Sequence, residues 1–189
     1  MFLIFGLGNP GKKYENTRHN IGSRMIDELR SSLALPSIRV INELKSLNFK
    51  NVILVKPNTF MNESGKAIKL LLRNNNTVVE LLQKGENLLI IHDDIDLPLG
   101  KIRIVKNRGS AGHKGVESII KELRTKNFIR FRIGIFPKHG KPKNPERFVL
   151  QKFNKEEEKI VKEITKKTVE AIEFFLKEGL EKTMSEYNK

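Results

Sequence analysis

His19 is the side chain in this sequence whose type and surroundings best suit acid–base chemistry. It lies in the stretch GLGNPGKKYENTRHNIG, residues 6–22, between a loop rich in glycine and proline and the start of a helical pattern. An unperturbed imidazole has a pKa of about 6.5, so it can act as a general base near neutral pH. Loops that carry specific polar residues beside a buried strand are often functional sites. We therefore take His19 as the first candidate catalytic residue.

Three aspartates, Asp93, Asp94 and Asp96, follow the apolar run in NLLIIHDDIDLP, residues 87–98. Ligands of α/β sheets usually bind at the carboxyl ends of the strands. Two interpretations remain open: the aspartates hold Mg²⁺, which prefers oxygen ligands, or a single buried carboxylate orients a histidine. Alternation along a strand places Asp93 on the opposite face from Asp94 and Asp96, which weakens the Mg²⁺ interpretation. We expect no metal ion.

Neutral amides and a glycine-rich turn add further candidates. Asn9 and Asn62 can hold a water or a carbonyl group without adding charge. Asn62 lies in TFMNESG, residues 59–65, where it can equally cap the helix that follows. The turn GSAGHKG, residues 109–115, lacks the full pattern of a nucleotide-binding P-loop, but its backbone amides and Lys114 can hold one phosphate.

Gly6, Gly8 and Gly11 match the dinucleotide fingerprint GxGxxG after a short apolar strand. In that fingerprint a helix begins inside the glycine run and faces the pyrophosphate. Here the run is followed by KKYENTRHN, which has no apolar helical period. The acidic residue expected at the end of a second strand is also missing, because Asp27 and Glu28 fall on a helix. We expect no nucleotide cofactor, and no cofactor of another kind.

Composition restricts the class of protein. The chain has 189 residues, no cysteine and a net charge of +14. Residues 101–152 hold fifteen Lys or Arg against three Glu, a net charge of +12, which favours a polyanionic partner and above all nucleic acid. The absence of cysteine, of a membrane-length apolar run and of a signal peptide predicts a cytoplasmic protein that does not bind membranes. The four histidines, His19, His92, His113 and His139, do not have the spacing of zinc ligands.

The elements that must position these side chains alternate along the chain. Strands are expected at Phe2–Phe5, Leu44–Phe49, Asn51–Lys56, Asn87–His92, Lys101–Lys106 and Ile129–Ile135. Helices are expected at Asn20–Leu33, Asn62–Arg73, Lys114–Arg124 and Lys155–Lys177. This alternation predicts an α/β single-domain sandwich over residues 1–189, with a mixed β-sheet flanked by helices. The segment Pro137–Pro145 is expected to be a basic loop rich in turns.

Five motifs together resemble bacterial peptidyl-tRNA hydrolase, in the order and at the spacing of that family. They are GLGNPG–YENTRHNIG, TFMNESGKA, HDDIDLPLGKIRI, GSAGHKGVESII and FIRFRIGI. The resemblance covers essentially the whole chain. It implies a hydrolase that cleaves the ester between a peptide and the 3′-terminal ribose of tRNA and releases the tRNA for reuse in translation and ribosome rescue. It also implies a monomeric α/β domain with a mixed twisted sheet, no metal and no DNA partner.

The resemblance also implies roles for individual residues. His19 would activate water and Asp93 would hold and polarise it, while Asn9 would help distinguish N-blocked from free aminoacyl-tRNA. Contacts to the tRNA 3′ end and the peptide would come from Tyr14, Phe60, Asn62 and Lys114. A clamp for a phosphate of the acceptor stem would be formed by Arg132 with Lys106 or Arg103.

The chain departs from the family pattern in one motif, and one alternative function remains. The family usually has Asn where this chain has Lys114, and GGH where it has GH, so the role of Lys114 is open. Lys can donate hydrogen bonds but cannot accept them as Asn does. The alternative function is a non-catalytic RNA-binding protein on the same fold. A base and a carboxylate favour the enzyme, because a protein that only binds RNA needs neither.

Overall fold

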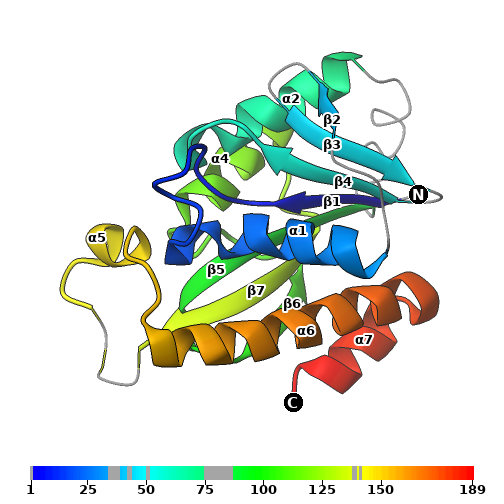
Figure 1. Cartoon of the computed structure of the whole chain (residues 1–189). Helices are drawn as coiled ribbons and strands as arrows, with labels where there is room; N and C mark the ends of the chain where they lie inside the picture. The colour runs from blue at the N-terminus through cyan, green and yellow to red at the C-terminus, as the bar shows by residue number, and fades with distance from the viewer. Residues whose placement is uncertain are drawn as a thin grey trace.

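A seven-stranded mixed sheet forms the centre of the computed structural model, which describes residues 2–33, 39–41, 44–49, 52–74, 87–137, 140 and 142–189. The strands are ordered β2-β3-β4-β1-β5-β7-β6 and twist across the molecule (Figure 1). The neighbours β4, β1, β5 and β7 run parallel, whereas the pairs β2–β3, β3–β4 and β6–β7 are antiparallel. The strands are β1 (Phe2–Gly6), β2 (Arg39–Ile41), β3 (Leu44–Phe49), β4 (Val52–Pro57), β5 (Leu88–Pro98), β6 (Ile102–Lys106) and β7 (Ile129–Phe136).

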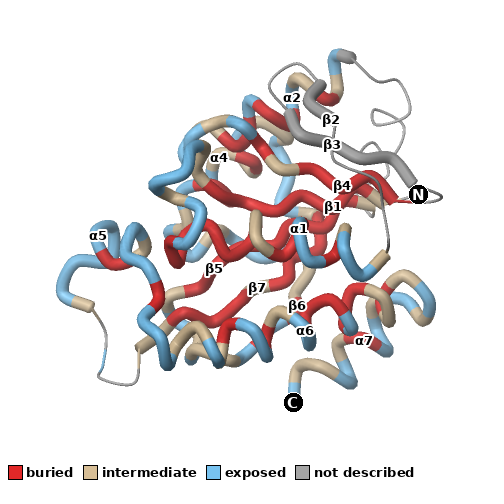
Figure 2. Tube along the Cα trace, in the orientation of Figure 1, coloured by how far each residue is buried: buried red, intermediate tan, exposed pale blue. Residues whose placement is uncertain are grey.

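Helices cover both faces of this sheet, so the central strands are buried on both sides (Figures 1 and 2). One apolar cluster joins the sheet to α1 (Ile21–Ser32) and α6 (Lys155–Glu178). A second cluster joins the opposite face to α2 (Ser64–Asn74) and α4 (Lys114–Leu123). Within β1, Ile4 belongs to the first cluster and its neighbours Leu3 and Phe5 to the second. The continuous apolar run of β1 follows from this two-sided burial. The predicted α/β sandwich is confirmed.

Strand β5 continues further than the sequence indicated. It was expected to end at His92, but it runs to Pro98 and carries the acidic residues within the strand. Its pairing with β7 extends to Asp94 opposite Gly134 and then shifts register. A Cβ on Gly134 would lie 1.9 Å from the carbonyl oxygen of Pro98, so only glycine lets the two strands approach here. The long strand brings Asp94 to Arg132 on β7 and Asp93 to His113 in the turn before α4.

Three short elements were not expected from the sequence, namely β2, α5 (Pro145–Val149) and α7 (Leu180–Tyr187). Gly179, at φ +84°, separates α6 from α7. Of the expected loop Pro137–Pro145, residues 138, 139 and 141 lie outside the described part of the chain, and His139 is one of them. None of the described helices is long and apolar enough to cross a lipid bilayer.

Candidate active site

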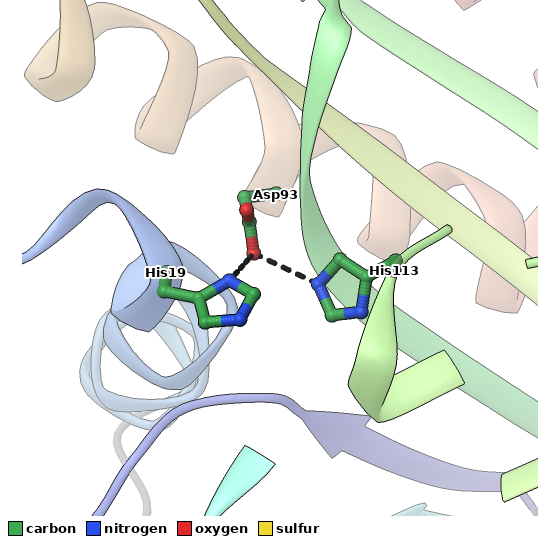
Figure 3. Close-up of side chains that lie close together, drawn as sticks. All are labelled: His19, Asp93 and His113. Atoms are coloured by element: carbon green, nitrogen blue, oxygen red, sulfur yellow. Dashed lines mark hydrogen bonds and ion pairs between the residues drawn. The ribbon is translucent and has the colours of Figure 1, made fainter. Parts of the chain in front are cut away.

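Three side chains from distant parts of the sequence meet at the carboxyl end of the central strands. Nδ1 of His19 lies 2.8 Å from Oδ1 of Asp93, and Nε2 of His113 lies 2.9 Å from the same oxygen (Figure 3). His19 lies on the single turn η1 (Arg18–Asn20), Asp93 on β5, and His113 directly before α4. Asp93 is buried, while the two rings are almost buried. The expected pairing of His19 with Asp93 is present in the structure, and His113 joins it.

The hydrogen bonds of His113 determine which of its two ring nitrogens carries the proton. Its Nδ1 accepts a hydrogen bond from the backbone N–H of Val116, at 3.3 Å, and so caps α4. The proton of the neutral ring is therefore on Nε2, which donates to Asp93. Burial alone would raise the pKa of Asp93, but electrostatic interaction and hydrogen bonds with His19 and His113 outweigh it and hold the pKa well below its usual range. Asp93 is thus a carboxylate that accepts from both rings, and Nε2 of His19 is left to take up a proton.

Close packing between α1 and the sheet brings His19 to Asp93. The backbone N–H of Leu7 donates to the carbonyl of Ile91 at 3.0 Å, and the N–H of Ser23 donates to the carbonyl of Leu7 at 2.8 Å. A Cβ on Gly22 would lie 2.2 Å from the carbonyl oxygen of Ile91, so a larger residue would push the helix away from β5. The glycine in TRHNIG therefore allows the start of α1 to approach the strand that carries Asp93.

Asn9 is held in place by two partners. Its Oδ1 accepts from the backbone N–H of Met61 at 2.8 Å. Its backbone N–H and carbonyl both bond the side chain of Asn20, each at 2.9 Å. Within the described residues its amide nitrogen Nδ2 donates to no other group, although Asn9 lines the pocket described below. Asn20 was missed from the sequence, where an amide before a helix suggests only a cap. It makes no side-chain capping bond.

A pocket of about 540 Å³ lies in front of the His19–Asp93 pair. The expected site residues that line it are Asn9, His19, Asn62, Asp93 and Lys114. Asn62 lies within the turn η2 (Met61–Glu63), whose N-cap residue is Phe60. Tyr14 and Phe60 are not part of the lining but pack edge to face, with ring centroids 6.3 Å apart, and Phe60 is 51% exposed. Tyr14 and Phe60 thus form an aromatic pair outside the pocket.

The other acidic side chains near the pocket have their own partners. Asp94 accepts from the backbone N–H of Asp96 at 2.9 Å and pairs with Nε of Arg132. Asp93 and Asp94 therefore point to different groups, as strand alternation indicated. Among the described residues, the group with metal-ligand geometry is His19, Asp93 and His113. His113 would have to move the proton from Nε2 to Nδ1, against the N–H of Val116, so this set does not suit a metal ion.

His92 is buried on β5 and lines the pocket next to Asp93. Burial, followed by the electrostatic interaction with His113, lowers the pKa of His92 well below 6.5. Its Nδ1 lies 2.6 Å from the backbone carbonyl of Asp93, and its ring packs against that of His113 with centroids 4.6 Å apart. His92 therefore stays neutral and supports the strand that carries Asp93.

The basic residues expected to bind phosphate divide into two groups. Arg103 and Arg132 are register partners on β6 and β7 and share one face of the sheet. Lys106 pairs with Ile129 and, by alternation, lies on the opposite face from Arg103. Arg132 is engaged by Asp94, and Arg103 donates to the carbonyl of Asn188 at 3.1 Å. The structure therefore groups Arg103 with Arg132 but not with Lys106.

Lys114 connects two edges of the pocket. Its Nζ lies 2.7 Å from Oε1 of Glu146 on α5, and both side chains are exposed. The hydrogen bond and the charge of Lys114 hold the pKa of Glu146 below its usual range. Lys114 thus points toward α5, and its amine pairs with Glu146 rather than with Asp93.

The chain is similar to known proteins over nearly its whole length. The family model described as peptidyl-tRNA hydrolase matches residues 3–189. Curated proteins named peptidyl-tRNA hydrolase include one from Thermodesulfovibrio yellowstonii, 43% identical over the whole of both chains, and one from Aquifex aeolicus, 44% identical over 90% of this chain and 87% of the relative. A crystal structure of peptidyl-tRNA hydrolase from Acinetobacter baumannii superposes with a TM-score of 0.85, at 27% identity, over all of this chain and 94% of the other. The chain belongs to the peptidyl-tRNA hydrolase family.

Proposed function

We propose that this protein is a peptidyl-tRNA hydrolase whose His19 activates the water that cleaves the ester between a peptide and the 3′-terminal ribose of tRNA. Membership of the family supports the activity. The observation that supports this role for His19 is the 2.8 Å bond between His19 and the buried carboxylate of Asp93 beside the pocket. A protein that only binds RNA has no need of such a pair.

The reaction follows from the protonation of the site. Nε2 of His19 takes a proton from water while the water oxygen attacks the ester carbonyl, and Asp93 stabilises the imidazolium that forms. The C–O bond to the ribose then breaks, and His19 returns the proton to the departing 3′ oxygen. Asn9 lines the same pocket, and its Nδ2 would donate to a carbonyl of the peptide, because Met61 already holds its Oδ1. Asn62 lines the pocket and gives a second neutral contact.

The tRNA would be held by groups around the pocket. Arg103 and Arg132 lie together on β6 and β7 and would bind a phosphate of the acceptor stem, for which Arg132 would exchange part of its contact with Asp94. The exposed pair Tyr14 and Phe60 offers ring faces for the bases of the 3′ end. Lys114 would contact the substrate after leaving Glu146. We expect the protein to act as a monomer in the cytoplasm, on tRNA and not on DNA.

One assay separates the enzyme from its alternatives. Wild type and His19→Ala are incubated with N-acetyl-aminoacyl-tRNA and with unblocked aminoacyl-tRNA, with and without EDTA. We expect release from the blocked substrate only, unaffected by EDTA and lost in the variant. Wild-type protein that binds tRNA without turnover would support the RNA-binding function instead, and loss of activity with EDTA would show that a metal ion is required.

A further inference from the structure

Arg18, the residue directly before His19, is buried against segments from the other end of the chain. It is 5% exposed, and its Nη2 donates to both carboxylate oxygens of Glu157, at 2.9 and 2.8 Å. Glu157 lies in the first turn of α6, where its side chain also accepts from the backbone of Asn154 in a capping box. The guanidinium of Arg18 is therefore tied to a helix end that is itself fixed.

Two aromatic rings enclose the same guanidinium group. Its central carbon Cζ lies 4.3 Å from the ring centroid of Phe148 and 4.7 Å from that of Phe153. Both rings are buried, Phe148 on α5 and Phe153 just before α6. Nε and Nη1 of Arg18 are buried and have no hydrogen-bond partner within the described chain. Stacking on the two rings, rather than further hydrogen bonds, stabilises this end of the side chain.

Backbone contacts also join the turn η1 to the segment between α5 and α6. The N–H of Arg18 donates to the carbonyl of Gln151 at 3.0 Å, and Thr17 forms an isolated bridge with Lys152. The turn that carries His19 is thus attached through its first residue to the segment between α5 and α6. That segment lies beside the loop before α1 in Figure 1.

Helix α5 also forms one wall of the pocket. The pocket lining includes Pro145, Glu146, Val149 and Leu150 as well as Asp93. A shift of α5 would move Phe148, and with it one face of the Arg18 stack. Arg18 consequently links a wall of the pocket to the turn η1, which carries the candidate base His19.

We propose that Arg18 is a positioning residue. It anchors the turn η1 to α5 and to the first turn of α6, and thereby holds the ring of His19 against Asp93. The proposal rests on His19 being the base of the proposed function. It differs from a purely stabilising role because Arg18 must affect the geometry of His19 and not only the stability of the fold. Misplacement of a reacting group by about 1 Å can cost about 10²-fold in rate.

The chain provides a matched control in Arg24. This residue on α1 pairs with both carboxylate oxygens of Glu158, at 3.0 and 2.8 Å, and therefore joins α1 to α6 as Arg18 joins η1 to α6. Arg24 is six positions away from Arg18, and its side chain is 25% exposed. Arg24→Met removes an ion pair of the same kind to the same helix without altering the residue next to His19.

The test compares Arg18→Met, Arg18→Lys and Arg24→Met by steady-state kinetics on N-acetyl-aminoacyl-tRNA, with the melting temperature of each variant. A second readout is the NMR signal of the proton on Nδ1 of His19 in protein with ¹⁵N-labelled histidine, which reports the bond to Asp93. We expect Arg18→Met to lower kcat by about ten- to a hundredfold with little change in KM. The His19 signal should weaken through faster exchange. Arg18→Lys should recover little of the lost kcat, because Lys neither stacks on the two rings nor forms a paired contact with the carboxylate.

The measurements distinguish a positioning role of Arg18 from a purely structural one. If Arg18→Met and Arg24→Met lower the melting temperature alike and both keep the wild-type kcat and the His19 signal, Arg18 is structural only and the proposal is wrong. Should Arg18→Met fail to fold, Glu157→Gln weakens the same pair while keeping the shape of the side chain. A kcat and a His19 signal equal to wild type in that variant would overturn the proposal. His19→Asn is measured in parallel, because full activity in that variant would refute the base itself rather than the role of Arg18.

Discussion

The rings of His19 and His113 donate hydrogen bonds to the same oxygen of one carboxylate, with their centroids 4.9 Å apart. The shared acceptor is Oδ1 of Asp93, whose pKa the two rings hold well below its usual range in spite of burial. Because His113 is fixed in turn by the backbone of Val116, the carboxylate has a defined orientation before substrate binds. In the proposed reaction this arrangement would let Asp93 stabilise an imidazolium on His19 without a large rearrangement.

We predict that His113→Asn lowers kcat while leaving the fold intact. Asn is as good an N-cap as His for the N–H of Val116, but its shorter side chain cannot reach Asp93. The loss of one hydrogen bond to a charged group, about 1.5–3 kcal/mol, corresponds to a decrease in kcat of about ten- to a hundredfold. Urea unfolding should remain cooperative, with a midpoint below that of wild type because the buried carboxylate of Asp93 loses one donor. A wild-type kcat in this variant would mean that His19 alone is enough to orient Asp93.

The stability of the protein should fall as the pH falls below about 6.5, and His92 should be one cause. Burial lowers the pKa of His92 in the folded state, so below the unfolded value of about 6.5 the unfolded chain binds more protons. The free energy of unfolding therefore decreases on acidification, by up to about 1.4 kcal/mol per pH unit for this group. Asp93 affects stability in another pH range. Its pKa is depressed in the folded state, so its contribution to the free energy of unfolding is complete above pH ~4 and is lost below that.

Urea titrations at pH 7.5 and pH 5.5 check the contribution of His92. His92→Asn keeps a donor for the carbonyl of Asp93 but removes the titrating ring, so its loss of stability between the two pH values should be smaller than that of wild type. An equal loss in the two proteins would show that other groups are responsible.

The sequence predicted the sandwich because each central strand and long helix has a clear apolar pattern. β1 and the first part of β5 are continuous apolar runs, as strands buried on both faces must be. The end of β5 could not be placed, because HDDIDLP is as polar as a loop. Asp93 and Asp94 remain in the strand because His19, His113 and Arg132 pair with them. Those partners come from other elements, so local patterns do not reveal them.

For the same reason, the sequence indicated some residues of the site and not others. His19 and Asp93 stood out by type, but they are 74 positions apart and only the family resemblance suggested that they meet. His113 and Asn20 gave no separate signal, because a polar residue before a helix usually indicates a cap. Arg18 was not singled out, since the two rings and the carboxylate that enclose it lie more than 125 positions away. A contact of that kind depends on the tertiary fold and not on local propensity.

Replacement of Asn9 should separate substrate discrimination from structure. Asn9→Asp keeps the acceptor for the N–H of Met61 but replaces the donor Nδ2 by a second oxygen. Loss of one donor to a substrate carbonyl typically costs about 10²–10³ in rate, so we expect a decrease of that size on N-acetyl-aminoacyl-tRNA. The preference for blocked over free aminoacyl-tRNA should narrow, because a carboxylate attracts a free amino group. An unchanged preference, with both substrates slowed alike, would assign Asn9 to structure only.

The two faces of the antiparallel pair β6–β7 give the sharpest test of phosphate binding. Arg103 lies with Arg132 on one face and Lys106 on the other, although both side chains were candidates for the clamp. Arg103→Ala should raise KM for tRNA with kcat nearly unchanged, because it removes binding that is equal in the ground state and the transition state. A plot of log KM against log salt should also lose about one unit of slope, as expected for one phosphate contact. Lys106→Ala is the matched control: it removes one charge from the same strand and should leave that slope intact. If both variants weaken binding equally, general charge and not a clamp holds the acceptor stem, and if neither does, the tRNA contacts another surface.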